Sequence, residues 1–396
     1  MDFAYTAEDE AFRAELREWL AVNLAEFGAG TVEPYEGMSR VYGRRQAWQR
    51  RMAEGGWAAI NWPAKWGGRD ATLMQNIIYS QEMAKAKTPG IFNANGVWQI
   101  GPMIIKWGTP EQQDRWLHNI LYAEEHWCQG FSEPEAGSDL ANLRLLAIRD
   151  GDDYVLDGQK IWCTTAHFAR WGLFLVRTDP TAIERGAKHE GITALIVDLK
   201  VPGVTATPIT DIAGEDSFCL VTFDGARVPV DYRLGGEGEG WLVAMGTLTN
   251  ERVGTAGLSI TMKADLDNVV ELARKHNPGA LADPELRDRL ARAYTQIELT
   301  RLLNFRALSK VLKGDKGWPE VQIAKLQWSH LAQTLAELQV DLLGPAAVLT
   351  RGGEDAIDRG AWTRLYSYQR FTSIGAGTTQ VQKNIIADRA LKLPRK

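Results

Sequence analysis

A strand-like pattern interrupts the helical pattern of this sequence once. Between two long regions patterned for helices, residues 125–232 are patterned for strands. They contain short alternating or β-branched runs, such as DYVLDGQKIW, WGLFLVRTDP and ITALIVDLKVPGVTATPI, separated by Gly, Pro and Asp. Before them, AFRAELREWLAVNLAEF repeats apolar residues at helical spacing. We therefore predict an N-terminal helical domain (residues 1–124), a central β domain (125–232) and a C-terminal helical domain (233–396).

The C-terminal region begins with one long helical pattern. After the turn-like segment LGGEGEGW, apolar residues recur at helical spacing until Pro278 and Gly279 break the pattern. Asp283 then precedes PELRDRLARAYTQIELTRLL, and its carboxylate is placed to accept hydrogen bonds from the free N–H groups of a new helix. We therefore expect two long helices on either side of this break.

The charge balance argues against a nucleic-acid partner. The chain has 45 Lys+Arg against 50 Asp+Glu, a formal net charge of -5, so no overall basic field attracts phosphate polymers or anionic lipids. The densest basic segment, GRRQAWQRR at residues 43–51, could be a base-stacking patch. Helical spacing instead favours a solvated helix face with Trp48 and Met52 turned inward.

The sequence suggests no targeting or membrane segment. The N-terminus has acidic residues at positions 2, 8, 9 and 10 and no apolar run, which argues against a secretory or transit peptide. No later stretch approaches the roughly 18 uninterrupted apolar residues of a membrane helix. We expect a cytoplasmic protein with no membrane partner.

The cysteines and histidines predict no metal centre. Cys128, Cys163 and Cys219 lie far apart with no CxxC pair, and the six histidines form no HxxxH set. We therefore predict neither a disulfide framework nor a zinc site, and we interpret Cys163 as a small buried hydrophobe.

Two segments of the β region are candidate binding motifs. QGFSEPEAGSD, residues 129–139, combines hydroxyls with a rigid turn and suits a heteroaromatic ring or a phosphate, although the same residue types also make ordinary loops. In GQKIWCTTAHF, residues 158–168, Trp162 and Thr164 are two apart and share a strand face. They could cover a flat cofactor and bond its edge, or they could be a core tryptophan and a satisfied threonine.

A third candidate lies near the C-terminus. RFTSIGAGTTQVQKNII, residues 370–386, places Gly375 and Gly377 on either side of Ala376 and opens a helix at Thr378. Unpaired N–H groups and the positive end of the dipole at a helix start stabilise a phosphate. The segment is not a dinucleotide-binding fingerprint, because it follows helical sequence and lacks the third glycine.

Six segments, in this order, resemble the acyl-CoA dehydrogenase family over nearly the whole chain: GWAAINWPAKWGG, FSEPEAGSDLANL, DGQKIWCTT, VTFDGARVPVDYRLGGEGEGW, TNERVGTAG and IGAGTTQVQKNIIADR. The resemblance implies an α+β fold with an N-terminal helical domain, a central β-barrel-like domain and a C-terminal four-helix bundle. It also implies FAD as the cofactor, bound between the β domain and the bundle and completed by a neighbouring subunit.

The resemblance assigns the family's flavin and substrate contacts to the matching positions of this chain. Phe131 and Ser132 would meet the flavin ring, Trp162 would lie against it, and Thr164 would hydrogen-bond its N5 edge. The resemblance places further FAD contacts at Gln129, Ser138, Gly375, Gly377, Thr378 and Gln380. It places substrate contacts at Ser138, Leu248, Arg252 and Ala376, with Ser138 facing the CoA thioester.

The resemblance raises one chemical problem. In the family a carboxylate removes the α-proton of the acyl-CoA while hydride passes from the β carbon to flavin N5. Short- and medium-chain members have a glutamate where this chain has Ala376, and losing a general base typically costs about 10²–10⁴-fold in rate, roughly 3–5 kcal/mol. Isovaleryl and long-chain members carry the base in a Glu-Arg pair on the long helix after the β domain. TLTNERVGTAG aligns Glu251 with that base and Arg252 with its neighbour.

Glu251 could instead belong to a solvated charge pair, the usual role of a Glu-Arg dipeptide in a helix. The apolar residues Trp241, Leu242, Met245 and Leu248 define the predicted buried stripe of this helix, and Glu251 lies at its margin. The N–H of Ala376 would stabilise the enolate-like charge on the thioester oxygen, by about 2.7–4 kcal/mol for such a donor. Because Ala376 leaves the turn without a carboxylate and Glu251 aligns with the alternative base, we predict Glu251 as the catalytic base of an enzyme that forms a trans-2-enoyl-CoA.

Two segments depart from the family pattern. ARKHNPGAL (273–281) replaces an arginine-containing FAD segment, and QVDLLGPAAV (339–348) replaces a Gln-x-x-Gly-Gly segment. They keep one alternative open, a non-catalytic or FAD-sharing subunit of a heteromeric dehydrogenase. A flavin oxidase or monooxygenase on the same fold is a further alternative. The main expectation is a homo-oligomer, a dimer or tetramer, that oxidises an acyl-CoA and passes electrons to an electron-transfer flavoprotein. The length and branching of the acyl group stay open.

Overall fold

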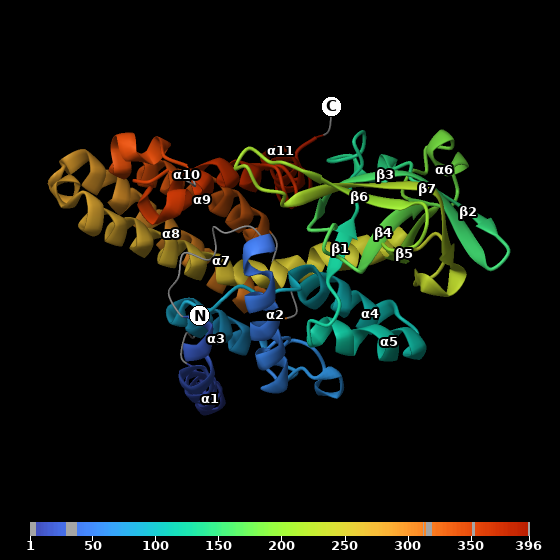
Figure 1. The fold of residues 1–396 in the computed structure, drawn as a ribbon, viewed down its shortest axis with the longest axis horizontal. Coiled ribbons are helices and arrows are strands. Elements are labelled where there is room, and N and C mark those ends of the chain that lie inside the picture. The colour runs from blue at the N-terminus through green and yellow to red at the C-terminus, as the bar shows by residue number, and fades with distance from the viewer. Residues whose placement is uncertain (1–4, 29–37, 312, 314–318, 351–352, 395–396) are drawn as a thin grey trace. The chain divides into compact units, whose positions relative to one another are not determined.

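The computed structural model describes residues 5–28, 38–311, 313, 319–350 and 353–394 (Figure 1). For residues 247–258 and Val311 it describes the backbone alone. The chain divides into two compact units. The first unit contains Met1–Glu36, Thr72–Thr88 and Arg252–Lys396, and the second contains Gly37–Ala71 and Pro89–Glu251.

The first unit is helical, as the periodicity predicts. Its helices are α1 (Ala7–Asn23), α3 (Leu73–Ala86), most of α7 (Gly240–His276), α8 (Pro284–Val311), α9 (Glu320–Leu343), α10 (Ala361–Tyr368) and α11 (Thr379–Ile385). Short turns join them: η1 (Ala25–Phe27), η7 (Pro278–Ala282), η8 (Gly344–Val348), η9 (Ile357–Gly360), η10 (Gln369–Ser373) and the π-helical η11 (Ile386–Ala390). The core of this unit lies between α7, α8 and α9, where Met262, Ile297 and Leu335 are almost fully buried.

The predicted helix breaks are confirmed. α7 ends at His276, and η7 separates it from α8. The Asp283 carboxylate accepts a hydrogen bond from the Glu285 N–H at 2.9 Å, which caps α8. Thr378 caps α11 in the same way, because its hydroxyl accepts from the Val381 N–H at 3.1 Å.

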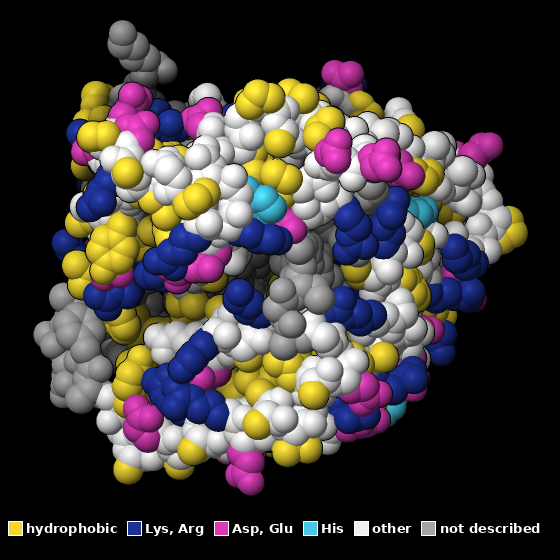
Figure 2. Space-filling view, turned by 60° about the vertical axis from the view of Figure 1, so that its left-hand side comes forward, with side chains coloured by type: hydrophobic (Ala, Val, Ile, Leu, Met, Phe, Trp, Pro, Cys, Tyr) yellow, Lys and Arg dark blue, Asp and Glu magenta, His cyan; other side chains and the backbone are white. Residues whose placement is uncertain are grey.

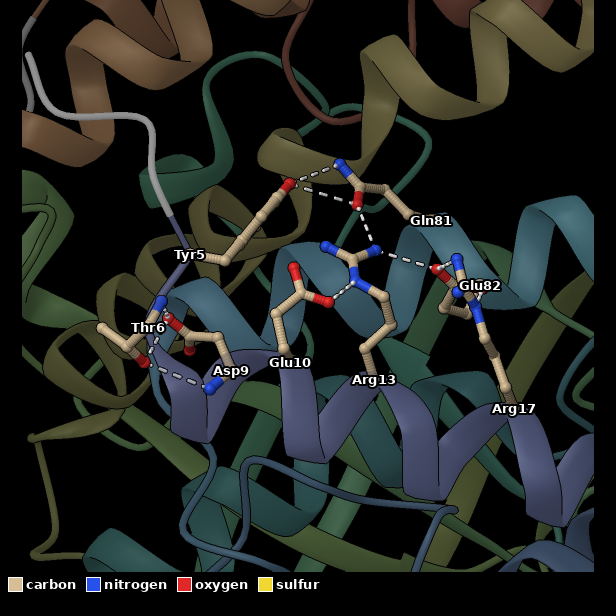
Figure 3. A network of polar contacts seen from close by, with 8 residues as sticks. All are labelled: Tyr5, Thr6, Asp9, Glu10, Arg13, Arg17, Gln81 and Glu82. Atoms are coloured by element: carbon tan, nitrogen blue, oxygen red, sulfur yellow. Dashed lines mark hydrogen bonds and ion pairs between the residues drawn. The ribbon is translucent and has the colours of Figure 1, made fainter.

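A buried carboxylate joins α1 to α3 (Figure 3). Glu82 accepts hydrogen bonds from Arg13 Nη1 at 2.8 Å and from Arg17 Nε at 2.7 Å. The Glu82 side chain is 5% exposed, so burial alone would raise its pKa, but the bonds from the two arginines hold the pKa of Glu82 below its usual value. The network fixes the pairing of these two helices.

The second unit has helices before its sheet. They are α2 (Met38–Glu54), α4 (Gly101–Trp107) and α5 (Pro110–Leu121), with the turns η3 (Ala64–Trp66) and π-helical η4 (Gly96–Ile100). Trp48 and Met52 of α2 are 0% and 1% exposed, which confirms that the basic segment turns them inward. The buried Gln49 amide links these elements, since it donates to the Ile120 carbonyl and accepts from the Asn93 N–H, both at 2.8 Å.

Eight strands in the described part of the second unit form one mixed sheet in the order β6-β7-β3-β2-β4-β5-β8, with β1 parallel to β4 (Figure 1). Their bounds are β1 (Trp127–Gly130), β2 (Leu146–Asp150), β3 (Asp153–Thr164), β4 (Trp171–Arg177), β5 (Ile192–Asp198), β6 (Val204–Ile209), β7 (Phe218–Pro229) and β8 (Arg233–Leu234). The turns η5 (Leu140–Asn142) and η6 (Val230–Tyr232) and the one-turn helix α6 (Thr181–Glu184) lie between strands.

Helix α6 was not predicted from the sequence. The Asp179 carboxylate accepts hydrogen bonds from the Thr181 N–H at 2.9 Å and from its hydroxyl at 2.7 Å, which stabilises this turn. The region predicted as purely β therefore contains a short α-helical turn besides the 3-10 turns η5 and η6.

The sheet encloses an apolar core that includes the three cysteines. Cys128, Cys163 and Cys219 are fully buried free thiols, which confirms the interpretation of Cys163 as a small buried hydrophobe. Strand pairing places Cys163 opposite Cys219. Burial raises the pKa of the Cys163 thiol to about 12, so this thiol is protonated and unreactive at neutral pH.

The predicted buried stripe at the start of α7 is wrong for Leu242, which is 54% exposed. Val243 and Ala244 are fully buried instead. The physical reason is the close approach of Gly240 to β5, where an added Cβ would lie 2.5 Å from the Thr193 carbonyl carbon. This backbone contact rotates the first turn of α7 so that Val243 and Ala244 meet the unit's interior.

No helix among the described residues is both long and apolar enough to span a bilayer. On the face shown in Figure 2, Lys and Arg side chains lie among Asp, Glu and apolar side chains rather than in one continuous basic surface. This mixture agrees with the formal net charge of -5.

A buried histidine supports the residue that follows β3. His126 is 5% exposed, and its Nε2 lies 2.7 Å from the Thr165 hydroxyl. Thr165 has a φ of +53°, a conformation that a β-branched residue rarely adopts. Burial, together with the nearby His167, lowers the pKa of His126 to about 4, so this imidazole is neutral in the folded protein.

Acidification should destabilise the wild-type protein more than a His126→Phe variant. Histidine in the unfolded chain binds its proton near pH 6.5, whereas His126 in the folded protein does so near pH 4. Between these values the unfolded state binds more protons, so the free energy of unfolding decreases as the pH is lowered. Between pH 7 and pH 4 this histidine alone should account for about 3 kcal/mol of lost stability. Urea unfolding at both pH values measures the difference. His118→Phe, at an exposed position, is the control, and equal losses in the two variants would contradict a neutral His126.

Candidate active site

The end of β3 presents Trp162 in a strained and exposed position. Trp162 has a φ of +61° and is 56% exposed. The pairing of β3 with β7 shifts register between Lys160 and Cys163, as happens where an extra residue leaves the ladder. A non-glycine residue in this conformation costs about 1–3 kcal/mol, and such residues cluster at binding sites. The exposure excludes the alternative interpretation of Trp162 as a core tryptophan.

The two-residue spacing does place Trp162 and Thr164 on one side of the strand. Both are exposed, and they flank the buried Cys163. The indole of Trp162 makes an edge contact with Phe218 on β7, with ring centroids 6.0 Å apart. One face of this strand end therefore offers an aromatic surface beside a hydroxyl.

The loop after β1 is hydrogen-bonded to the same part of β3. The Ser132 carbonyl accepts a hydrogen bond from the Ile161 N–H at 2.9 Å, so Ser132 lies beside the residue that precedes Trp162. Ser132 is half-buried, whereas Phe131 is 9% exposed. The structure thus brings three predicted flavin contacts, Ser132, Trp162 and Thr164, into one surface.

The remaining predicted residues of the second unit lie on either side of Ser132. Gln129 is half-buried within β1, opposite Leu173 of β4. Reciprocal backbone bonds of 3.1 Å between Glu133 and Ala136 close the turn after Ser132. Ser138 follows that turn and is exposed at the outer end of the loop.

Beneath this surface lies a buried ion pair that the sequence analysis missed. Lys160 Nζ lies 2.8 Å from Glu133 Oε1, and the two side chains are 0% and 8% exposed. The pKa of Lys160 falls to about 8, because burial opposes its positive charge more strongly than Glu133 favours it. Strand alternation could have revealed this residue, because Lys160 shares the inward face of β3 with the buried Tyr154 and Leu156.

A second group of predicted residues lies in the first unit, in the turn before α11. Ala376 and Gly377 have φ values of +53° and +86°, and an added Cβ at Gly377 would lie 2.7 Å from Gln382 Nε2. Glycine is therefore required at 377, whereas Ala376 accepts a strained backbone. Gly375 and Thr378 are half-buried, and Gln380 is exposed in the first turn of α11.

Two side chains that the sequence analysis missed hold the carbonyl groups of this turn. Lys325 of α9 is 7% exposed, and its Nζ donates to the Gly377 carbonyl at 2.8 Å and to the Thr372 carbonyl at 3.0 Å. Gln382 Nε2 donates to the Ala376 carbonyl at 3.1 Å. Burial lowers the pKa of Lys325.

The same bonds leave backbone donors directed away from these side chains. In a trans peptide the C=O and N–H groups point in opposite directions, so the carbonyls of Ala376 and Gly377 set the directions of the Gly377 and Thr378 N–H groups. Within the described ranges the structure shows no acceptor for the N–H groups of residues 376, 377 and 378. Such a run of free donors suits an anionic group.

The third group lies on α7. Leu248, Glu251 and Arg252 are on this helix, but their side chains are outside the part of the chain that the structure describes. Glu251 follows the fully buried Ala244 by seven residues, which is about two helical turns. The roles of these three residues stay predictions.

Comparison with known proteins identifies three consecutive domains. The acyl-CoA dehydrogenase N-terminal domain matches residues 6–124, the middle domain matches residues 128–226, and the C-terminal domain matches residues 238–391. The three matches together span most of the chain.

Named relatives match along nearly the full chain. Acyl-CoA dehydrogenase IpdE1 of Mycobacterium tuberculosis is 40% identical over 392 residues, with 98% of each chain covered. FadE26 of the same organism is 33% identical, with 100% of this chain and 99% of that one covered. The mitochondrial short-chain specific acyl-CoA dehydrogenase of Bos taurus is 30% identical over 355 residues, with 87% and 82% covered.

Solved structures agree with the described fold. The Tcur3481-Tcur3483 steroid ACAD has a TM-score of 0.85 at 29% identity, and the ChsE4-ChsE5 complex from Mycobacterium tuberculosis has a TM-score of 0.81 at 31% identity. Both comparisons cover 100% of each chain. The predicted α+β fold, with helical, β and helical domains in that order, is confirmed. The chain belongs to the acyl-CoA dehydrogenase family of oxidoreductases.

Proposed function

We propose that this protein is an FAD-dependent dehydrogenase that converts an acyl-CoA thioester to the trans-2-enoyl-CoA. The observation that carries the proposal is the exposed, left-handed Trp162 at the end of β3, joined through Ile161 to the Ser132 loop. A large aromatic surface held at a strained position, beside hydroxyl donors, suits a flat heteroaromatic ligand.

Two groups of residues fit the cofactor. In the second unit, the flavin end of FAD would be held by Gln129, Phe131, Ser132, Ser138, Trp162 and Thr164. In the first unit, FAD would be held by Gly375, Gly377, Thr378 and Gln380. The N–H groups of Gly377 and Thr378, which have no acceptor among the described residues, supply hydrogen bonds that a phosphate oxygen can accept. When bound, FAD supplies the acceptor for the hydride that leaves the β carbon of the substrate.

Glu251 would remove the α-proton. The methyl group of Ala376 cannot accept a proton, but its N–H lacks an acceptor in the described chain and can bond the thioester oxygen. That bond would stabilise the negative charge that develops as the α-proton leaves. Leu248, Arg252 and Ser138 would contact the substrate, and the small Ala376 leaves room for its acyl group.

The substrate class follows from the relatives. Two solved neighbours are named for a steroid ACAD and for a complex of ChsE4 with ChsE5. We therefore propose a bulky, steroid-derived acyl group as the substrate class. An electron-transfer flavoprotein would accept the electrons, and the working form would be a homo-oligomer, a dimer or tetramer.

A heteromeric assembly is the second candidate, and one observation favours it. Gln339, in the segment that departs from the family pattern, is 1% exposed, and neither polar atom of its amide has a hydrogen-bond partner among the described residues. A buried amide is normally hydrogen-bonded, so a ligand or a second chain would supply the missing groups. Because segments 273–281 and 339–348 both depart from the family pattern, a chain of another sequence would be the one that completes the FAD site.

A Glu251→Gln variant should lose the proton-transfer step and keep the cofactor. In anaerobic titrations with straight, branched and steroid-side-chain acyl-CoAs, wild type should bleach the visible flavin absorbance with at least one thioester. The variant should bleach about 10²–10⁴-fold more slowly, because the amide cannot accept the α-proton.

The matched control is Glu271→Gln, on the same helix, where the carboxylate is exposed beside Arg274. It should bleach at the wild-type rate. If Glu251→Gln also bleaches at that rate, Glu251 is not the base. If wild type expressed alone contains no flavin, the heteromeric candidate is favoured.

A Lys325→Met variant should bind FAD more weakly. The substitution leaves the Gly377 carbonyl without its buried donor, whereas the Thr372 carbonyl keeps a hydrogen bond from the Ser329 hydroxyl at 2.8 Å. The direction of the Thr378 N–H, which shares a peptide group with the Gly377 carbonyl, is then no longer fixed. We expect a loss of about tenfold or more in FAD affinity, since an unsatisfied buried carbonyl costs about 1–3 kcal/mol. Flavin fluorescence titration of the apoprotein measures it, with the exposed Lys263→Met as control. Unchanged affinity would show that the turn keeps its geometry without Lys325.

A further inference from the structure

The buried ion pair between Lys160 and Glu133 makes more hydrogen bonds than a simple pair. Besides Glu133, the Lys160 ammonium donates to the Phe131 carbonyl at 2.9 Å. The Glu133 carboxylate also accepts from the N–H groups of Arg144 at 2.6 Å and Leu145 at 2.8 Å. The pair therefore joins three segments: β3, the loop after β1, and the residues before β2.

Stability alone explains this pair poorly. Two charges lose their hydration when they are buried, and replacing a buried ion pair by well-packed apolar residues is often neutral or stabilising. The completely buried position of Lys160 could be filled by an apolar side chain of similar volume, such as that of methionine. A buried polar network, by contrast, can fix one backbone geometry.

The network around Lys160 and Glu133 fixes the backbone geometry at Ser132. Lys160 holds the carbonyl of Phe131, and this carbonyl shares a peptide group with the Ser132 N–H. Because C=O and N–H point in opposite directions in a trans peptide, the Ser132 N–H is directed away from Lys160. On the other side, the Ser132 carbonyl is held by the Ile161 N–H. Both peptide groups that flank Ser132 are therefore fixed by β3.

The Ser132 N–H is a donor without an acceptor in the described chain. Ser132 is half-buried and lies beside the strand end that carries the exposed Trp162. A fixed, unsatisfied backbone donor next to an exposed aromatic ring matches the edge of a flat heteroaromatic ligand, which carries hydrogen-bond acceptors in its plane.

We propose that Lys160 and Glu133 are positioning residues that aim the Ser132 N–H at the isoalloxazine ring of FAD. This inference rests on the proposed function. Both side chains are buried under the surface, so they act through the backbone of Phe131 and Ser132 and do not contact the cofactor. The exposed residues provide the contacts, and the buried pair sets where those contacts are.

The test compares two ways of removing the pair. Lys160→Met removes the ammonium and leaves a buried carboxylate, so it lowers the thermal midpoint strongly. The double variant Lys160→Met/Glu133→Gln removes both charges of the pair, while the buried Arg177 keeps its bonds to the Ala141 and Glu190 carbonyls. It is the variant on which the proposal is judged. The control Arg227→Met/Asp150→Asn removes an exposed ion pair of the same sheet, whose charged atoms lie 2.8 Å apart.

Three quantities are measured for wild type and each variant. They are the thermal midpoint of the apoprotein, its FAD affinity by flavin fluorescence quenching, and the visible circular dichroism of the flavin after reconstitution with FAD. We expect the double variant to bind FAD at least tenfold more weakly than wild type and to give an altered dichroism spectrum. The control variant should match wild type in both flavin measurements.

The outcomes separate this inference from the proposed function. If wild type binds FAD and the double variant binds it with the same affinity and spectrum, the positioning role is wrong whatever the thermal midpoint does. If wild type itself does not bind FAD, the proposed function fails and this inference fails with it. A double variant that does not fold at all, while the control does, would assign the pair to folding and would also overturn the positioning role.

Discussion

The candidate site depends on one constraint: the structure around the end of β3 must hold its backbone in the left-handed conformation. Trp162 and Thr165 both have positive φ values, each costing about 1–3 kcal/mol, so their surroundings must hold them in place. The Thr165 hydroxyl meets the buried His126, and the Thr165 N–H bonds the Ser217 carbonyl at 3.0 Å. Between the two strained residues, Cys163 is anchored in the core. Burial and hydrogen bonds around β3 therefore hold the Trp162 indole in its exposed position.

The two compact units use the same physical device at their candidate binding surfaces. In the second unit, buried Lys160 donates to the carbonyl of Phe131. In the first unit, buried Lys325 donates to the carbonyls of Thr372 and Gly377. In both places a cation that ligands cannot reach holds a carbonyl, and the N–H of the same peptide is directed the other way. Each loop thus acquires fixed backbone donors without exposing a charge.

Much of the fold could be predicted from the sequence, because periodicity and capping are local. Asp283 and Thr378 cap their helices as expected. The buried position predicted for Leu242 is wrong, because the contact of Gly240 with β5 sets the rotation of α7 and depends on residues far away in the chain. The exposure of Trp162 could not be decided from its spacing. Lys160 and Lys325 were missed because a lysine is normally solvated, and only the three-dimensional surroundings show that both are buried.

The left-handed backbone at residue 376 affects how this family can change in evolution. Any residue with a β carbon is strained at a φ of +53° by a similar amount, about 1–2 kcal/mol, whether it ends in a methyl or a carboxylate group. The turn is held through its carbonyls by Lys325 and Gln382, so its bonds do not involve the side chain at 376. Alanine and glutamate are therefore interchangeable here as far as the backbone is concerned. A lineage could gain a carboxylate on α7 first and lose the one in the turn later, with the turn unchanged at each step.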